Sequence, residues 1–534
     1  MIEAAAYTGG VPDAAALADA ICTRLAPLAV DLNLAWWNVN VESTEANESR
    51  RVEAELALSG LLADRDLFAA IEAARADGDG GPGRRQLDLL RDAFLPKQID
   101  DDVRTRIVEL EASVDGRFNT HRGVVVGREV TDNEIKHILR HESDIALRCE
   151  AWEASKTVGA AVADDVQELA RLRNRAAHSL HYRDWFALSI ATSEMDEEKL
   201  FATLDEVDRA TAEPFARWKA ALDERLAARF GCAVSELRPW HYADPFFQEV
   251  PDDGGVALDH VFEGRDILEL SRSTFDGIGI ETRGILERSD LFPRERKCQH
   301  AFCMDVDRDG DIRVLANVVP NHDWMDTMLH ELGHGVFDAG IDPGLPWLLR
   351  SCHLVSTEAI AILFGHLAGD AQWLQRVAGL GAYEARALAE PLRLRRGAAK
   401  VLFARWVLVM TNFERRLYAD PEGNLDETWW ELVRRFQLVT PPEGRRAPDW
   451  AAKIHIASAP VYYHTYLYGD LLASQLAAAL RREAGGLVEM PAAGRFLQER
   501  WFRPGLSLRW DELVAHASGE ALTARHYAHD IAGV

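Results

Sequence analysis

The sequence predicts a mainly α-helical protein with a small antiparallel β-sheet beside one histidine-bearing helix. Ala, Leu, Arg and Glu dominate the 534 residues, and apolar side chains recur at three- and four-residue intervals. Convincing strand patterns occur only at residues 300–306 and 312–319. Hydrophobic residues make up 48% of the chain, which is enough for a sizeable core. These observations together favour one large helical body.

The helices can be placed in order along the chain. Residues 13–75 fit two or three amphipathic helices. Thr131 and Glu134 have the spacing of a capping box that starts another helix. Long helical stretches then continue to about Phe230. Gly- and Asp-rich segments predict two loops, at residues 77–83 and 251–255.

The predicted sheet is a hairpin. Residues 300–306 and 312–319 are rich in apolar and β-branched side chains, and Asp307-Arg308-Asp309-Gly310 suits the turn between them. Pro320 ends the second strand, and a helix is expected from about Asp323.

Charge and composition exclude several classes of protein. Lys and Arg number 60 against 86 Asp and Glu, so the formal net charge is −26. A general nucleic-acid binder would be basic, and docking on an anionic membrane would need a basic patch. We therefore expect neither nucleic-acid nor membrane partners. The sequence does not indicate an oligomeric state.

The N-terminal segment lacks the pattern of a secretory signal, and no stretch approaches 18 consecutive apolar residues. The cysteines are few and form no CxxC pair, which argues against a disulfide scaffold and a thiolate zinc site. We expect a reduced, cytoplasmic protein. The six cysteines are Cys22, Cys149, Cys232, Cys298, Cys303 and Cys352.

His330-Glu331-Leu332-Gly333-His334 is an HExxH motif. Residues i and i+4 share one face of a helix, so both imidazoles can bind one metal ion, and Glu331 can act on a water molecule beside it. The alternative is a surface helix with two unrelated histidines. A catalytic zinc of this type needs a third protein ligand.

Glu358, 24 residues after His334, is the candidate third ligand, because the segment 340–346 can turn the chain back. A carboxylate on an apolar helix face is costly unless it is paired or bound to metal. A solvated helix residue is the alternative interpretation of Glu358, and His353 is a rival ligand.

A second cluster lies near the C-terminus, where Tyr462, Tyr463 and Tyr466 follow Lys453 and His455. Buried phenols need hydrogen-bond partners, and they can donate to the oxyanion that forms when a peptide carbonyl is attacked. An aromatic packing stripe is the alternative.

Together these residues resemble the angiotensin-converting-enzyme-like (M2) family of zinc metallopeptidases, which is related to the M3 thimet-oligopeptidase and oligoendopeptidase families. The resemblance covers most of the chain. The matching segments are Ala35–Asn40, Arg171–Asn174 through Trp185, His300-Ala301 with Asp305, the motif residues His330, Glu331, His334 and Glu358, Trp429–Leu432, Thr440–Pro442, and Lys453–His455.

The resemblance implies a role for each candidate residue. One Zn²⁺ per chain is held by His330, His334 and Glu358, and Glu331 is the general base. Tyr466 is the closest match for the oxyanion donor. His455 is placed at the catalytic centre and also contacts substrate. The remaining implied substrate-binding residues are His300, Ala301, Lys453, Tyr462 and Tyr463.

The resemblance also implies a helical gluzincin fold with a deep central channel. On this resemblance, residues 1–534 are expected to form a single peptidase unit of two interlocked halves, with an N-terminal helical lid at 1–130. Residues 290–370 are the zinc-site core, and residues 425–534 carry the Lys/His/Tyr motif.

The implied activity is hydrolysis of short peptides by metal-activated water, as a dipeptidyl carboxypeptidase or an oligoendopeptidase. The alternatives are a zinc hydrolase or tailoring enzyme acting on a peptide-like metabolite, and a catalytically silent peptide-binding relative.

Three departures from the family pattern qualify this expectation. Asp244 falls near the family's glutamine for the substrate carboxylate, which weakens the dipeptidyl-carboxypeptidase interpretation. Val433 and His464 stand where chloride-binding arginines are expected, so chloride activation is not expected. Ile362 replaces an aspartate after the glutamate ligand, and Asp326 is the candidate replacement partner for the metal site.

Overall fold

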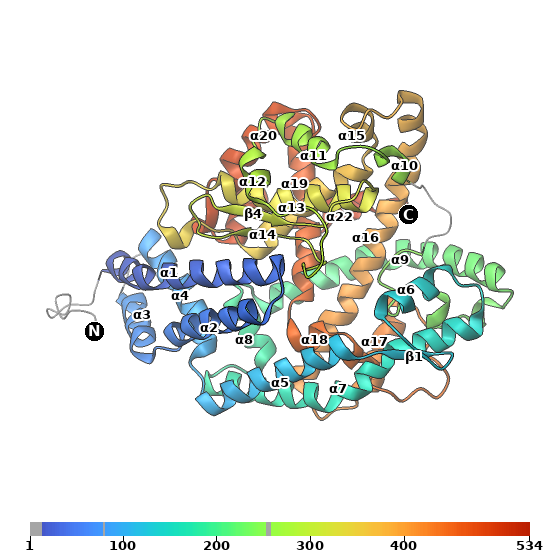
Figure 1. Ribbon diagram of the computed structural model, residues 1–534, viewed down its shortest axis with the longest axis horizontal. Helices are drawn as coiled ribbons and strands as arrows, with labels where there is room; N and C mark the ends of the chain where they lie inside the picture. The colour runs from blue at the N-terminus through green and yellow to red at the C-terminus, as the bar shows by residue number, and fades with distance from the viewer. Residues whose placement is uncertain (1–12, 78–80, 252–257, 534) are drawn as a thin grey trace. The chain divides into compact units, whose positions relative to one another are not determined.

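The computed structural model describes residues 13–77, 81–251 and 258–533. It is 71% helical, and its described part contains two small two-stranded antiparallel sheets. The prediction of a mainly α-helical protein is therefore confirmed (Figure 1). The expected loops fall partly outside the described residues, at 78–80 and 252–255, as does the N-terminal segment 1–12.

The chain divides into two compact units built from interleaved segments. Unit 1 comprises residues 1–98, 257–392 and 468–523, and unit 2 comprises residues 99–256, 393–467 and 524–534. The divisions after residues 392 and 467 fall within α16 (Ala382–Ala419) and α19 (Tyr463–Ala484). The predicted lid at 1–130 and the single peptidase unit stay predictions.

Unit 1 contains one hairpin and most of the shorter helices. Its elements are α1 (Ala14–Val41), α2 (Glu45–Leu62), α3 (Arg65–Asp77), α4 (Pro82–Phe94), α10 (Asp259–Phe262), α11 (Ile267–Asp276), α12 (Arg283–Arg288), β3 (Phe302–Asp305), β4 (Ile312–Leu315), α13 (His322–Gly340), α14 (Leu354–Gly365), α15 (Ala371–Arg376), α20 (Pro491–Leu497) and α21 (Trp510–Ser518).

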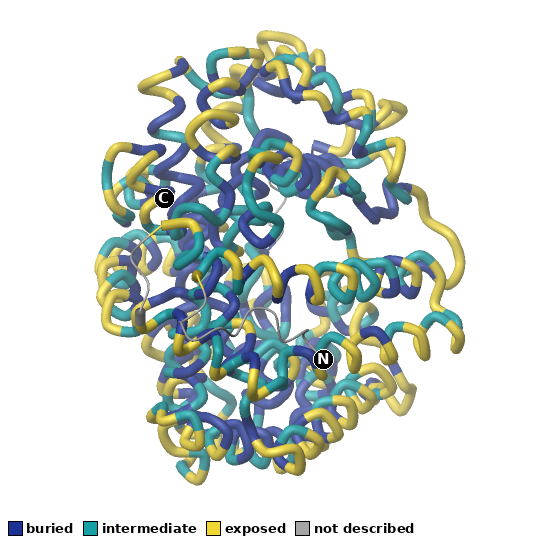
Figure 2. The backbone as a smooth tube through the Cα atoms, turned by 90° about the vertical axis from the view of Figure 1, so that its left-hand side faces the viewer, coloured by how far each residue is buried: buried dark blue, intermediate teal, exposed yellow. Residues whose placement is uncertain are grey.

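The first four helices of unit 1 bury a common apolar core. Ile21 of α1, Ile71 of α3, and Leu87 and Phe94 of α4 are fully buried within it. Asp13 caps α1 by accepting the Ala16 N–H. The expected two or three helices over residues 13–75 are α1, α2 and α3. Buried and exposed stretches alternate along many of the helices (Figure 2).

The predicted hairpin forms with shorter strands than expected. Phe302 of β3 pairs with Leu315 of β4, and Asp305 pairs with Ile312. The turn is stabilised by the Asp307 carboxylate, which accepts the backbone N–H groups of Asp309 and Asp311. Both strands pack against α13, so the hairpin supports the helix that carries the HExxH motif.

Unit 2 contains the longest helices and a second hairpin. Its elements are α5 (Asp101–Thr120), β1 (Gly123–Val125), β2 (Arg128–Val130), α6 (Asp132–His141), α7 (Ile145–Ser179), α8 (Trp185–Thr192), α9 (Glu197–Phe230), α17 (Leu425–Leu432), α18 (His455–Ser458) and α22 (Arg525–Asp530).

Sequence patterns located the helices of unit 2 better than its sheet. The predicted capping box of Thr131 and Glu134 starts α6, and α9 ends at Phe230. The β1–β2 hairpin was not predicted. Its turn places Val126 and Gly127 at φ of 51° and 69°, and only the Val-Gly dipeptide after a short valine run signals it. Among the described residues, no helix is long and apolar enough to cross a membrane.

Candidate metal centre

The helix α13 presents the HExxH histidines on one side and an apolar stripe on another. Asn321 caps the helix by accepting the Trp324 N–H. Met325, Met328 and Leu332 are fully buried. This burial fixes the rotation of the helix, so His330 and His334 lie one turn apart on the side that faces α14.

Two glycines allow α13 to approach its neighbours closely. A Cβ atom at Gly333 would lie 2.9 Å from the Ala361 Cα of α14. A Cβ atom at Gly335 would lie 3.4 Å from the Cys303 Sγ of β3. The backbone of the motif is therefore packed between α14 and the hairpin, and Gly333 sets the short distance across which a residue of α14 reaches the histidines.

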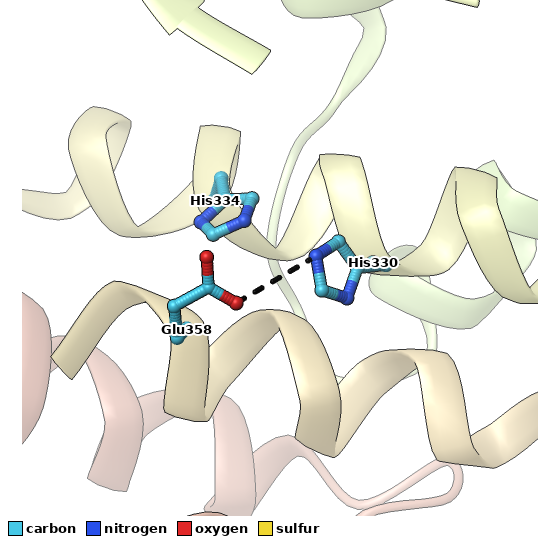
Figure 3. Close-up of side chains that lie close together, drawn as sticks. All are labelled: His330, His334 and Glu358. Atoms are coloured by element: carbon cyan, nitrogen blue, oxygen red, sulfur yellow. Dashed lines mark ion pairs between the residues drawn. The ribbon is translucent and has the colours of Figure 1, made fainter. Parts of the chain in front are cut away.

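Glu358 reaches the two histidines from α14. His353 caps this helix by accepting the Val355 N–H. Candidate ligand atoms of His330, His334 and Glu358 all lie within 4.8 Å of one another, and His330 Nε2 is 4.0 Å from Glu358 Oε2. Figure 3 shows both imidazoles and the carboxylate pointing toward one another. The structure thus brings the three predicted metal ligands together.

The surroundings favour the uncharged form of both imidazoles. Burial lowers the pKa of His330 to about 4. Burial, with a smaller contribution from His330, lowers the pKa of His334 to about 3. Neutral imidazole is the form that binds zinc.

The same burial raises the pKa values of the carboxyl groups of the site. Burial raises the pKa of Glu358 to about 7. Burial, followed by the Glu358 charge, raises the pKa of Glu331 to about 8, although the Cys303 backbone donates to it. Two carboxylates in a poorly solvated site disfavour each other's ionisation unless a cation neutralises them. Two neutral imidazoles and one carboxylate are the ligands of a His₂Glu zinc site. A zinc cation there would also neutralise the two neighbouring carboxylates.

Thr357 holds the ring of His334. The Thr357 Oγ1 atom lies 2.6 Å from His334 Nδ1. This contact leaves Nε2 of His334 as the ring nitrogen available to a metal ion. The sequence had indicated Asp326 as a partner for the site. Thr357 was not predicted, and the role of Asp326 stays a prediction.

His300 and Ala301 lie immediately before β3 in unit 1. His300 is exposed and Ala301 is half-buried. Because β3 packs against α13, both residues lie next to the start of the strand that flanks the helix with the HExxH motif. Their contact with substrate stays a prediction.

The remaining predicted residues form an aromatic cluster in unit 2. The ring of Tyr463 lies 4.9 Å from that of His455 and 5.6 Å from that of Tyr466. Tyr462 lies 5.1 Å from Tyr466. Burial, and then the charge of Lys453, lower the pKa of His455 to about 4, so this imidazole is neutral at pH 7. The structure thus groups Lys453, His455 and the three tyrosines.

The loop before α19 is held in a strained conformation. Val461 has φ of 57°, a left-handed value that costs a β-branched residue on the order of 1–3 kcal/mol. Its N–H donates to the Glu414 carboxylate at 2.6 Å. This buried hydrogen bond fixes the backbone from which Tyr462 and Tyr463 project.

Lys453 contacts a glutamine that sequence reasoning missed. Its Nζ atom donates to Gln248 Oε1 at 3.1 Å and lies 5.2 Å from the Phe246 ring centroid. Asp244, which was expected near a substrate carboxylate, instead accepts the backbone N–H groups of Phe246, Gln248 and Glu249. The Asp244 carboxylate is therefore engaged within its own loop, and Gln248, four residues later, is the side chain beside Lys453.

The model of peptidase family M3 matches residues 281–532, a segment that contains every predicted site residue. Comparison with curated proteins gives no match. The predicted relation to the thimet-oligopeptidase and oligoendopeptidase families is confirmed, whereas the resemblance to the angiotensin-converting-enzyme-like family stays a prediction. Family M3 consists of zinc metallopeptidases. Residues 281–532 thus relate this chain to peptidase family M3, and the protein is a zinc metallopeptidase, a hydrolase of peptide bonds.

Proposed function

We propose that the protein hydrolyses short peptides that carry a free C-terminal carboxylate and releases C-terminal dipeptides. The observation that carries this proposal is the contact between Lys453 and Gln248, because a cation beside an amide is suited to bind a carboxylate. The Asp244 carboxylate, which had argued against this activity, is occupied by backbone N–H groups. Oligoendopeptidase action is the second candidate.

His330, His334 and Glu358 would hold the zinc ion. When bound, zinc supplies Lewis-acid polarisation of the scissile carbonyl and lowers the pKa of water. Glu331 takes a proton from the attacking water as the water oxygen bonds to the carbonyl carbon. The Glu331 carboxyl group then passes that proton to the amide nitrogen, the C–N bond breaks, and the amine product leaves.

Tyr466 is proposed to donate its phenolic hydrogen to the oxyanion, with Tyr462 and Tyr463 beside it. A preorganised donor of this kind contributes about 10²–10³ in kcat. His455 is proposed to contact a substrate carbonyl or amide group. Its neutral imidazole has one N–H donor and one acceptor.

Lys453 is suited to a carboxylate because its surroundings are partly apolar. Its Nζ atom lies 5.5 Å from the ring centroids of both Trp406 and Tyr463. Burial lowers the pKa of Lys453 to about 8, so the ammonium form still dominates at pH 7. A charge that is poorly solvated gains more from an ionic ligand than a fully hydrated one does.

The test is a set of otherwise identical short peptides that end in a free carboxylate or in a carboxamide. We expect C-terminal dipeptides as products and a preference for the free acids. Lys453→Met should remove that preference by raising KM for the free acids. Lys199→Met removes one positive charge at an exposed position of the same unit and serves as the control.

Two results would contradict this assignment. Internal cuts with equal rates on acids and amides would favour the oligoendopeptidase. Cleavage of a non-peptide amide with no peptide turnover would favour the tailoring-enzyme alternative. Mass spectrometry of the products distinguishes these results.

A further inference from the structure

A chain of polar side chains runs from His334 into the interior of unit 1. His334 Nδ1 lies 2.6 Å from Thr357 Oγ1. The Thr357 hydroxyl in turn makes a hydrogen bond with the Cys352 thiol. The Cys352 Sγ donates to Asp338 Oδ1 at 3.4 Å. Two side chains, those of Thr357 and Cys352, thus connect the His334 ring to the Asp338 carboxyl group, which is not among the predicted site residues.

The fold brings these residues together from two helices. His334 and Asp338 are one turn apart on α13. Cys352 precedes α14, and Thr357 lies in its first turn. Because Gly333 allows α14 to lie close to α13, a hydroxyl on α14 can reach the histidine ring. Because His334 and Asp338 are four residues apart on α13, the series of hydrogen bonds that leaves this helix at His334 returns to it at Asp338.

The hydrogen bonds have one direction that satisfies every member. If Nε2 of His334 binds the metal ion, Nδ1 carries the hydrogen and donates to Thr357 Oγ1. The Thr357 hydroxyl is then free to donate to the Cys352 sulfur, and the thiol hydrogen donates to Asp338. The Asp338 Oδ1 atom accepts the thiol hydrogen, so Asp338 ends the chain. Each of the two middle groups accepts one hydrogen bond and donates one.

We propose that Thr357, Cys352 and Asp338 form a relay that positions His334 for metal binding. Thr357 fixes the tautomer and the orientation of the ring, Cys352 fixes the rotation of the Thr357 hydroxyl, and Asp338 fixes that of the thiol. The proposal rests on the proposed role of His334 as a zinc ligand. All three are positioning residues.

The neighbour of Thr357 on α14 supplies a matched control. Ser356 is fully buried, and its hydroxyl has no hydrogen-bond partner among the described residues. Ser356→Ala and Thr357→Val each remove one hydroxyl from adjacent positions of the same helix turn. Only Thr357→Val removes the contact with His334.

The test measures zinc affinity by competition with a chromophoric chelator, together with the melting temperature of the metal-free protein. Loss of a hydrogen-bond partner of a metal-bound histidine typically costs 10–100-fold in metal affinity. We expect Thr357→Val to weaken zinc binding by about that factor. Thr357→Ser, which keeps the hydroxyl, should restore most of the affinity. Cys352→Ala and Asp338→Asn should have smaller effects, because they act through Thr357.

The melting temperature separates positioning from folding. In the metal-free state Thr357→Val should melt only a degree or two below Ser356→Ala, because leaving buried hydrogen-bond partners unpaired costs about 1–3 kcal/mol and so long a chain shifts its melting temperature little for each kcal/mol lost. With Co²⁺ in place of zinc, the visible absorption bands of Thr357→Val should shift relative to the parent, and those of Ser356→Ala should not.

The outcomes distinguish the relay from the metal site itself. If the parent protein binds zinc and Thr357→Val binds it equally well, the relay is wrong and the metal site stands. If Thr357→Ser is as weak as Thr357→Val, the hydroxyl is not what positions the ring. If the parent protein binds no zinc, both the relay and the proposed metal site are wrong.

Discussion

Glu331 is the buried titratable residue between the two motif histidines, with 8% of its surface exposed. Burial and the Glu358 carboxylate hold its pKa well above the usual range of glutamate when no cation is present. A bound zinc ion would supply the compensating charge, so an ionised Glu331 and a metal ion in this site would depend on each other. Glu331, which follows the candidate ligand His330, is therefore suited to proton transfer rather than to metal binding.

Glu331→Gln is expected to keep zinc and to lose activity. The amide has the size of the carboxylate but cannot accept the proton, and removal of a general base typically costs 10²–10⁴ in rate. Zinc content by elemental analysis and kcat on a quenched fluorescent peptide are the measurements. A variant as active as the parent would show that another group is the base.

The lowered pKa of Lys453 predicts that kcat/KM depends on pH above neutrality. Burial is the main cause that lowers its pKa to about 8. The ammonium group is present below that pH and is lost as the pH rises through it. We therefore expect kcat/KM for free-acid peptides to fall above about pH 8, because this ratio reports the free enzyme. Lys453→Met should remove this fall, and a profile unchanged in the variant would assign it to a different group.

At the scale of elements, the site depends on the close crossing of α13 and α14. Gly333 has no Cβ atom, and one placed there would lie 2.9 Å from Ala361 Cα and 3.2 Å from the Ala361 backbone nitrogen. Backbone atoms cannot give way as a flexible side chain can. The position of Glu358 therefore depends on Gly333, a residue of the motif that has no side chain with which to bind a metal ion.

Gly333→Ala is expected to separate the two helices, to destabilise the protein by about 1–3 kcal/mol and to weaken zinc binding. Gly60→Ala in α2 is the control, because nothing lies within 4 Å of its added Cβ atom. That variant should gain about 0.5–1 kcal/mol, as expected for alanine in a helix interior. Chemical denaturation and chelator competition measure the two effects. If Gly333→Ala and Gly60→Ala change the stability and the zinc affinity equally, the crossing of α13 and α14 tolerates a methyl group.

At the scale of the whole molecule, all three candidate metal ligands belong to unit 1, which is assembled from three separate stretches of chain. A zinc ion held, as proposed, by α13 and α14 would favour the folded unit, because the unfolded chain does not preserve the site. The stabilisation is about 2.7 kcal/mol when free zinc is at 100 times its dissociation constant.

Removal of zinc by a chelator should therefore lower the melting temperature, and added zinc should restore it. Glu331→Gln should show the same shift as the parent, since the base is not a ligand, whereas His334→Ala should show none. Differential scanning calorimetry at fixed zinc concentration measures these shifts. A melting temperature that does not respond to zinc in the parent would argue against a metal held by both helices.

Local patterns were sufficient to predict much of the fold and to place the two candidate histidine ligands on one helix. The helical period places His330 and His334 on one face, and the capping box of Thr131 and Glu134 marks the start of α6, because both depend on residues a few positions apart. The β1–β2 hairpin was missed because its strands are three residues each and their alternation is weak.

The chain's own sequence determined the helical class, the HExxH motif and the candidate ligand Glu358. Only the tertiary structure decided which side chains support them. Thr357 meets His334 across two helices, and Gln248 meets Lys453 from 205 positions away. Such contacts depend on how closely helices pack and on which way a loop turns, as with Asp244, whose carboxylate is taken up by backbone N–H groups. Periodicity and spacing carry no information about packing between distant segments.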